Sequence, residues 1–192
     1  MTELFKFGED HAGYPVRVLN EREARGAAGI MFLFALIAFM NAWFKGDFTP
    51  TKLTIVAFFL DFFIRVIVNP RYSPTLIMAR WMVNNQTAEY AGAPQKRFAW
   101  AIGASMICLC LVFFHPEKFA GALNALTRHA LLPTTEQYLP RWLPLVMVWL
   151  CLGFMWLEAI LGFCVGCKIH ALLVKLGVLQ DPCEACNSLD FG

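Results

Sequence analysis

The feature that most constrains this chain is a long apolar run near its N-terminus. Residues 26–44 are 19 successive residues without a charged side chain. As a helix, about 20 apolar residues cross the hydrocarbon core of a bilayer. A cleaved signal peptide is the alternative, but its apolar stretch usually spans about 7–15 residues and lies closer to the chain start. We therefore expect a retained transmembrane helix.

Three further apolar runs follow, at residues 53–68, 98–114 and 142–167. Each run is continuous rather than alternating and too long for a strand of a membrane barrel, so helices are expected. The composition agrees, because 58% of the residues are hydrophobic and 16% are charged, whereas roughly a quarter of an ordinary soluble domain is charged. We predict an all-α, polytopic membrane protein with four transmembrane helices in a lipid bilayer.

Two connections between these runs carry helical patterns of their own. Ser73 and Pro74 suit the N-cap and first residue of a helix, and apolar residues follow them at helical spacing. His115 and Pro116 form a second start signal. The apolar face after it consists of Phe119, Leu123, Leu126 and Ala130. We expect two short interfacial amphipathic helices.

The distribution of lysine and arginine predicts the orientation. Ten of these residues lie on the side of the N-terminal segment and the C-terminal tail, and five lie on the opposite side. Because cytoplasmic loops carry the excess, both termini should be cytoplasmic in a multi-pass protein of the cytoplasmic (inner) membrane. The predicted divisions are a cytoplasmic segment at 1–25, a membrane domain at 26–176 and a cytoplasmic tail at 177–192. The net charge of +2 gives no reason to expect a nucleic-acid partner.

Three charged residues lie inside the predicted spans. Asp61 and Arg65 are four residues apart, so they share a helical face and can pair. The pair is either a relay or ligand site, or an ion pair that fixes helix packing. Glu158 has no partner within its own helix, and Arg65 or Asn41 are its candidate partners. A lone carboxylate inside a membrane is a functional hypothesis by default, with structure as the alternative.

Four of the seven cysteines form two CxxC pairs, Cys164/Cys167 and Cys183/Cys186, with 15 residues between them. A CxxC pair can perform thiol–disulfide or sulfur-transfer chemistry when one thiol has a lowered pKa. The C-terminal end of an unbroken helix would raise that pKa. Gly162 and Gly166 can break the helix, however, and would place Cys167 at the start of a new one.

Two other interpretations of the cysteine pairs stay open. The spacing of the four cysteines fits a zinc site, or less favourably an iron–sulfur cluster, with His170 as a possible base or further ligand. Alternatively, the first pair serves packing, since cysteine is commonly buried and two glycines four residues apart allow close helix contact. Cys108, Cys110 and Cys151 are assigned to packing.

Three stretches of the chain resemble a known family. They are DFFIR at residues 61–65 continued by NPRYSP at 69–74, GAPQKRFA at 92–99, and EAILGFCVGC at 158–167. Together they resemble the bacterial integral membrane family catalogued as domain of unknown function 4395, over roughly residues 15–173. The resemblance implies a small four-helix membrane protein with an Asp/Arg pair, a Glu and a CxxC. It implies no established activity and does not extend to the second CxxC.

The leading hypothesis is a membrane thiol protein without a cofactor. Cys164 and Cys167 would carry redox or persulfide chemistry at the cytoplasmic face, with Glu158 beneath them and a redox or sulfur-carrier protein as partner. One alternative is a non-catalytic accessory subunit of a larger membrane complex. Another is a membrane protein that binds zinc or an iron–sulfur cluster through Cys164, Cys167, Cys183 and Cys186.

Overall fold

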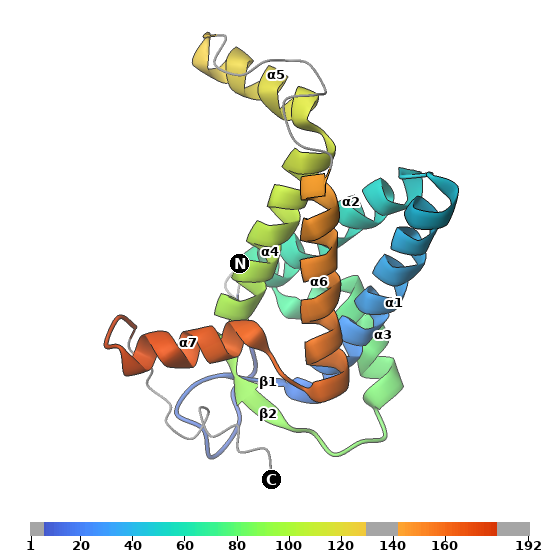
Figure 1. The fold of residues 1–192 in the computed structure, drawn as a ribbon. Coiled ribbons are helices and arrows are strands. Elements are labelled where there is room, and N and C mark those ends of the chain that lie inside the picture. Colours follow the sequence, from blue (N-terminus) through green and yellow to red (C-terminus); the bar gives the residue numbers. More distant parts are fainter. Residues whose placement is uncertain (1–5, 130–141, 180–192) are drawn as a thin grey trace.

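The computed structural model describes residues 6–129 and 142–179, which are mostly helical (Figure 1). Within these residues, three helices are long and apolar enough to cross a membrane: α1 (Glu21–Lys45), α4 (Ala93–Phe114) and α6 (Trp142–Leu161). Helix α6 packs against both α1 and α4. These helices agree with the prediction of a helical membrane protein.

The second predicted span is less regular than the other three. Helix α2 (Thr49–Phe63) has 15 residues, and a π-helix (Ile64–Val68) continues it. Alone, α2 rises only about 22 Å, which is shorter than a bilayer core. The structure therefore does not confirm the count of four transmembrane helices. The π-helix contains Arg65, and such irregular turns are frequent at functional sites.

The two helices predicted within the connections are present. Helix α3 (Pro74–Val83) begins after Ser73, whose Oγ accepts a hydrogen bond from the backbone N–H of Leu76 at 3.3 Å. Helix α5 (Pro116–Thr127) begins after His115. Ala130, the last residue of the apolar face predicted there, lies outside the described residues. The location of both helices at a membrane interface stays a prediction.

A two-stranded sheet is the element that the all-helical prediction missed. Strand β1 (Val18–Asn20) pairs antiparallel with β2 (Tyr90–Gly92). Strands of three residues are too short to show a period-2 pattern, so hydrophobic periodicity does not reveal them. Each strand leads directly into a long helix, β1 into α1 and β2 into α4. The sheet therefore places the first turns of α1 and α4 side by side.

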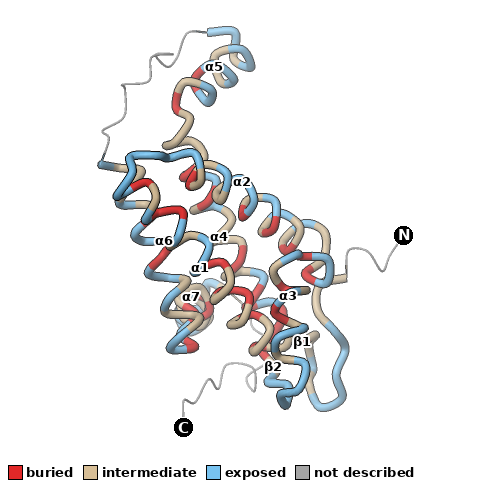
Figure 2. Tube along the Cα trace, turned by 90° about the vertical axis from the view of Figure 1, so that its right-hand side faces the viewer, coloured by how far each residue is buried: buried red, intermediate tan, exposed pale blue. Residues whose placement is uncertain are grey.

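Helix α7 (Val165–Lys175) crosses the same end of the molecule and packs against α4 (Figure 1). A Cβ on Gly166 would lie 2.6 Å from the Cα of Ala99, so only glycine permits this approach. Figure 2 shows buried positions along the inner sides of the long helices and exposed ones along the outer sides. The exposed positions include many large apolar residues, as a lipid-facing surface requires; examples are Leu33, Phe34, Phe44, Leu109, Trp149 and Ile160.

Candidate functional site

The helical structure is interrupted between α6 and α7, and this interruption places a cysteine at the N-terminus of α7. Helix α6 ends at Leu161, and Gly162 follows with a φ of +63°. A Cβ on Gly162 would lie 2.7 Å from the guanidinium carbon of Arg25, so a side chain there would meet both strain and a clash. The expected break is thus present, but the new helix begins at Val165 and Cys164, rather than Cys167, is its N-cap.

The two thiols of the first CxxC pair lie together and are buried. The Sγ atoms of Cys164 and Cys167 are 2.7 Å apart, and the Sγ of Cys164 also accepts from the backbone N–H of Cys167 at 3.4 Å. The hydrogen bond from the Cys167 thiol lowers the pKa of Cys164, and the charge of Lys96 lowers it further against the effect of burial. Donating that bond and being buried raise the pKa of Cys167. Cys164 is therefore the more readily ionised thiol of the pair.

A buried lysine joins three helices beside these thiols. The Nζ of Lys96 on α4 lies 2.8 Å from Glu21 Oε2 on α1 and 3.1 Å from Glu158 Oε1 on α6. The Nε of Arg25 lies 3.5 Å from Glu21 Oε1 and adds a second cation. Two carboxylates thus face two cations, and the side chain of Lys96 is only 1% exposed. Charges buried this deeply persist only when they are paired.

The partner of Glu158 differs from the predicted ones. Sequence reasoning proposed Arg65 or Asn41, whereas Glu158 binds Lys96 and the side chain of Asn41 donates to the backbone carbonyl of Ile37. In the sequence, Lys96 lies two residues before the third apolar run, which begins at Phe98. Helix α4 begins at Ala93, so Lys96 lies in its first turn and points into the bundle.

Asp61 and Arg65 form the predicted pair, with Arg65 Nε 2.7 Å from Asp61 Oδ2 and both residues buried. Asp61 also accepts from the Ser73 hydroxyl at 2.8 Å and from the Thr75 backbone N–H at 3.1 Å. The Arg65 guanidinium contacts the Met31 sulfur at 3.3 Å and lies over the rings of Phe62 and Trp100. The pair therefore ties the start of α3 to the π-helix, which favours a role in packing.

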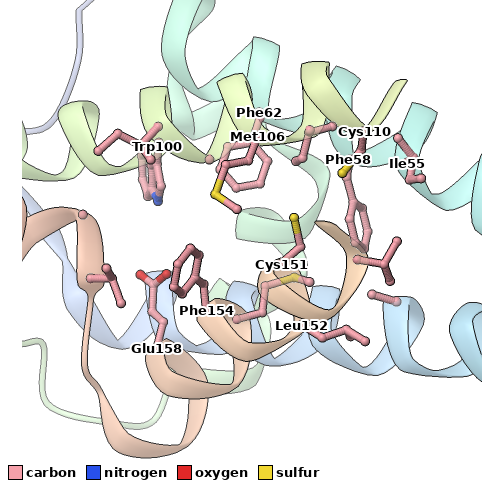
Figure 3. A pocket seen from close by; sticks show the side chains of 18 of the residues that line it. Ile55, Phe58, Phe62, Trp100, Met106, Cys110, Cys151, Leu152, Phe154 and Glu158 are labelled. Carbon is pink, nitrogen blue, oxygen red and sulfur yellow. The ribbon is translucent and has the colours of Figure 1, made fainter. Parts of the chain in front are cut away.

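A cavity of 170 Å³ runs between α2, α4 and α6 and reaches the thiol site. Figure 3 shows the Glu158 carboxylate and the Trp100 indole facing each other at one end of this space. Cys164 and Gly166 line the cavity as well, and Cys110 and Cys151 line it further along. Cys110 of α4 and Cys151 of α6 interact with each other, so two residues assigned to packing form a second thiol pair.

Three predicted site residues remain, namely Cys183, Cys186 and His170. Cys183 and Cys186 lie outside the described residues, so the four-cysteine metal site stays a prediction. Among residues 6–129 and 142–179, no three His, Cys, Asp or Glu side chains are grouped as metal ligands. His170 is buried and packs edge-on against Phe98, with 5.3 Å between the ring centroids.

Comparison with known proteins identifies a family. A family model described as Domain of unknown function (DUF4395) matches residues 19–175. No curated protein and no solved structure matches the chain. The matched range contains both thiol pairs of the described structure and the buried charges, and it ends before Cys183.

Proposed function

The chain belongs to the DUF4395 family, and from that premise and the geometry of the site we propose that it is a membrane thiol protein whose Cys164–Cys167 pair exchanges disulfides or transfers sulfur. One observation carries the proposal. The two thiols share a hydrogen bond at the N-terminus of α7, with Cys164 as acceptor and a buried Lys96 close enough to act on both. A helix N-terminus and a nearby cation are the features that activate a cysteine.

The exchange reaction follows from the order of the two pKa values. The Cys164 thiolate attacks one sulfur of a substrate disulfide, the S–S bond breaks, and one substrate thiolate leaves. Cys167 then loses its proton and attacks Cys164 Sγ, which closes the protein disulfide and releases the second substrate thiolate. With a persulfide substrate, the Cys164 thiolate attacks the outer sulfur instead, the substrate S–S bond breaks, and the substrate thiolate leaves, so that Cys164 carries the persulfide. Glu158 acts as a positioning residue in both cases, because it holds Lys96.

The same proposal includes a membrane topology. Helix α2 and the π-helix together cover residues 49–68, a length that makes a fourth span possible. The excess of lysine and arginine favours a cytoplasmic location for both termini in the inner membrane. Helix α7, whose first turn carries the thiol pair, lies at the same end as β1, β2 and the starts of α1 and α4 (Figure 1). On this topology the end of the molecule that carries the thiol pair would face the cytoplasm, where a redox or sulfur-carrier protein would approach it.

A second candidate function is that of an accessory subunit in a larger membrane complex. Helix α3 lies outside the three candidate spans and carries Trp81 and Met82 with 77% and 69% of their surface exposed. Neighbouring exposed apolar residues of this size suit a contact with another membrane protein. In that case the thiols would serve packing.

The deciding experiment measures the oxidation state of the first CxxC pair. The purified full chain is alkylated with a maleimide of large mass before and after reduction, and the modified peptides are identified by mass spectrometry. We expect a reversible shift of two thiols that Cys164→Ser and Cys167→Ser each abolish and Cys108→Ser leaves intact. The proposal fails if mild oxidants never close this disulfide. Bound zinc or iron found by elemental analysis would favour the four-cysteine site instead.

A further inference from the structure

The thiol pair is closed to solvent but open to the interior of the protein. Cys164 is 5% exposed and Cys167 is 4% exposed, so a folded partner protein does not reach either sulfur in this conformation. Cys164 nevertheless lines the cavity between α2, α4 and α6. The reactant that meets the Cys164 thiolate without any rearrangement is therefore a small molecule inside this cavity.

The shape and lining of the cavity restrict what that molecule is. Its volume is 170 Å³, and a cavity of about 150 Å³ lined by apolar residues is known to hold benzene. One six-membered ring with small substituents therefore fits. Aromatic side chains face the space from three helices, namely Phe58 and Phe62 of α2, Trp100 of α4 and Phe154 of α6 (Figure 3).

The polar groups of the cavity gather near the thiol. The carboxylate of Glu158 is turned into the space opposite Trp100 (Figure 3), and Cys164 lines the cavity with it. Three of the helices that line the cavity, α1, α4 and α6, are candidate membrane spans. The apolar lining thus favours a ligand that dissolves in the bilayer. The polar atoms of such a ligand would lie near the Glu158 carboxyl group, beside the Cys164 sulfur.

We propose that this cavity binds the head group of a lipid-soluble quinone, which takes two electrons from the Cys164–Cys167 pair. The inference rests on the proposed thiol function and names the oxidant. The Cys164 thiolate adds to a ring carbon of the quinone and forms a C–S bond. Cys167 then attacks Cys164 Sγ, the S–S bond forms, and the C–S bond breaks with its electron pair passing to the ring. One ring oxygen receives the proton of Cys167 and the other receives the proton that Cys164 gave up on ionising, so two thiols and a quinone become a disulfide and a hydroquinone.

The test uses the full chain, reduced and freed of reductant, in detergent without oxygen. A short-chain ubiquinone is added, and quinol formation is followed by absorbance while thiol loss is followed by mass-tag alkylation. We expect one quinol per chain, with loss of two thiols at Cys164 and Cys167 and no quinol from Cys164→Ser. Equal rates for the wild type and Cys164→Ser would overturn the proposal.

A cavity-filling variant tests the location. Ala35 of α1 lines the cavity, whereas Leu33 on the same helix is exposed on the outer side. Ala35→Phe fills the space with a ring and should slow the quinone reaction roughly tenfold or more, since the ligand then loses its site. Leu33→Phe, the matched control, should react at the wild-type rate. Equal rates for Ala35→Phe and Leu33→Phe would contradict the assignment.

Two further measurements keep the outcome clear. The first uses the wild type, so it does not depend on the folding of any variant. The redox-inactive ring 1,4-dimethoxybenzene should compete for the cavity and slow the quinone reaction. It should not slow oxidation of the thiols by diamide. If diamide closes the disulfide and the quinone does not, the quinone site is wrong and the thiol function stands. If neither reagent closes the disulfide, both proposals fail.

Discussion

Lys96 Nζ lies 2.8 Å from Glu21 Oε2, although 75 residues separate the two in the sequence. The contact exists because β1 and β2 pair immediately before the helices that carry these residues. Glu21 is the first residue of α1, where a negative charge is favourable. Lys96 lies in the first turn of α4, where a positive charge is unfavourable without partners. Glu21 and Glu158 supply those partners.

Removing the charge of Lys96 should therefore destabilise the protein strongly. Lys96→Met keeps most of the side-chain volume but leaves the Glu21 and Glu158 carboxylates facing each other without their shared cation. Breaking a buried ion pair in this way costs about 3–5 kcal/mol. Denaturant unfolding in detergent, followed by circular dichroism, measures the loss. Lys118→Met on the exposed side of α5 is the control and should stay within about 0.5 kcal/mol of the wild type; similar losses in the two variants would contradict the prediction.

The hydrogen bond between the thiols predicts a pH effect on Cys164. Cys167 is the largest cause of the lowered Cys164 pKa, so Cys167→Ala should move the pH midpoint of Cys164 alkylation upward. The rate with iodoacetamide, followed on the Cys164 peptide by mass spectrometry, gives the midpoint. Cys108→Ala should leave it unchanged. A midpoint that stays in place after Cys167→Ala would show that the thiol pair is not coupled.

The same lowered pKa gives a stability contribution with a defined sign. An unfolded cysteine titrates near pH 8.5, and the folded pKa of Cys164 lies below its ordinary value. The Cys164 thiolate therefore contributes stability that is complete above the unfolded pKa and is lost as the pH falls through the folded pKa. In Cys167→Ala this contribution should shrink, because the largest cause of the lowered pKa is removed. A comparison of unfolding midpoints across the pH series checks the direction.

How far the sequence predicts this site depends on how local each contact is. Asp61 and Arg65 could be paired from sequence because four residues place them on one helical face. The break at Gly162 could be expected because glycine tolerates the positive φ found there. The role of Lys96 could not, since its inward position depends on strands of three residues. The facing thiols of Cys110 and Cys151 come from different helices, and nothing in the local pattern of either helix indicates the other.

The close approach of α7 to α4 depends on Gly166, and a second glycine, Gly153, provides a matched control. In Gly166→Ala, the new Cβ would lie 2.6 Å from the Cα and Cβ of Ala99, so α7 has to move away from α4. We expect a loss of about 1–3 kcal/mol and faster alkylation of Cys164, because the helix that holds it shifts. Gly153→Ala within α6 meets nothing within 4 Å and should be neutral or stabilising by about 0.5–1 kcal/mol. Equal effects of the two substitutions on unfolding would contradict the packing argument.

The Asp61 carboxylate should stabilise the start of α3 as well as the charge of Arg65. Asp61→Asn removes the charge that holds the buried guanidinium and weakens the acceptor for Ser73 and Thr75, so the start of α3 loses its anchor. The loss in unfolding free energy should be about 3–5 kcal/mol, because a buried cation remains without its carboxylate. Limited trypsin digestion provides a second readout, since cleavage after Arg71 should accelerate once α3 is released. Asp47→Asn, just before the start of α2, removes a similar but exposed charge and should leave both the unfolding midpoint and the cleavage rate close to those of the wild type. Asp61→Asn with wild-type stability and wild-type cleavage would show that the pair is not what fixes α3, and would reopen the relay hypothesis for Asp61 and Arg65.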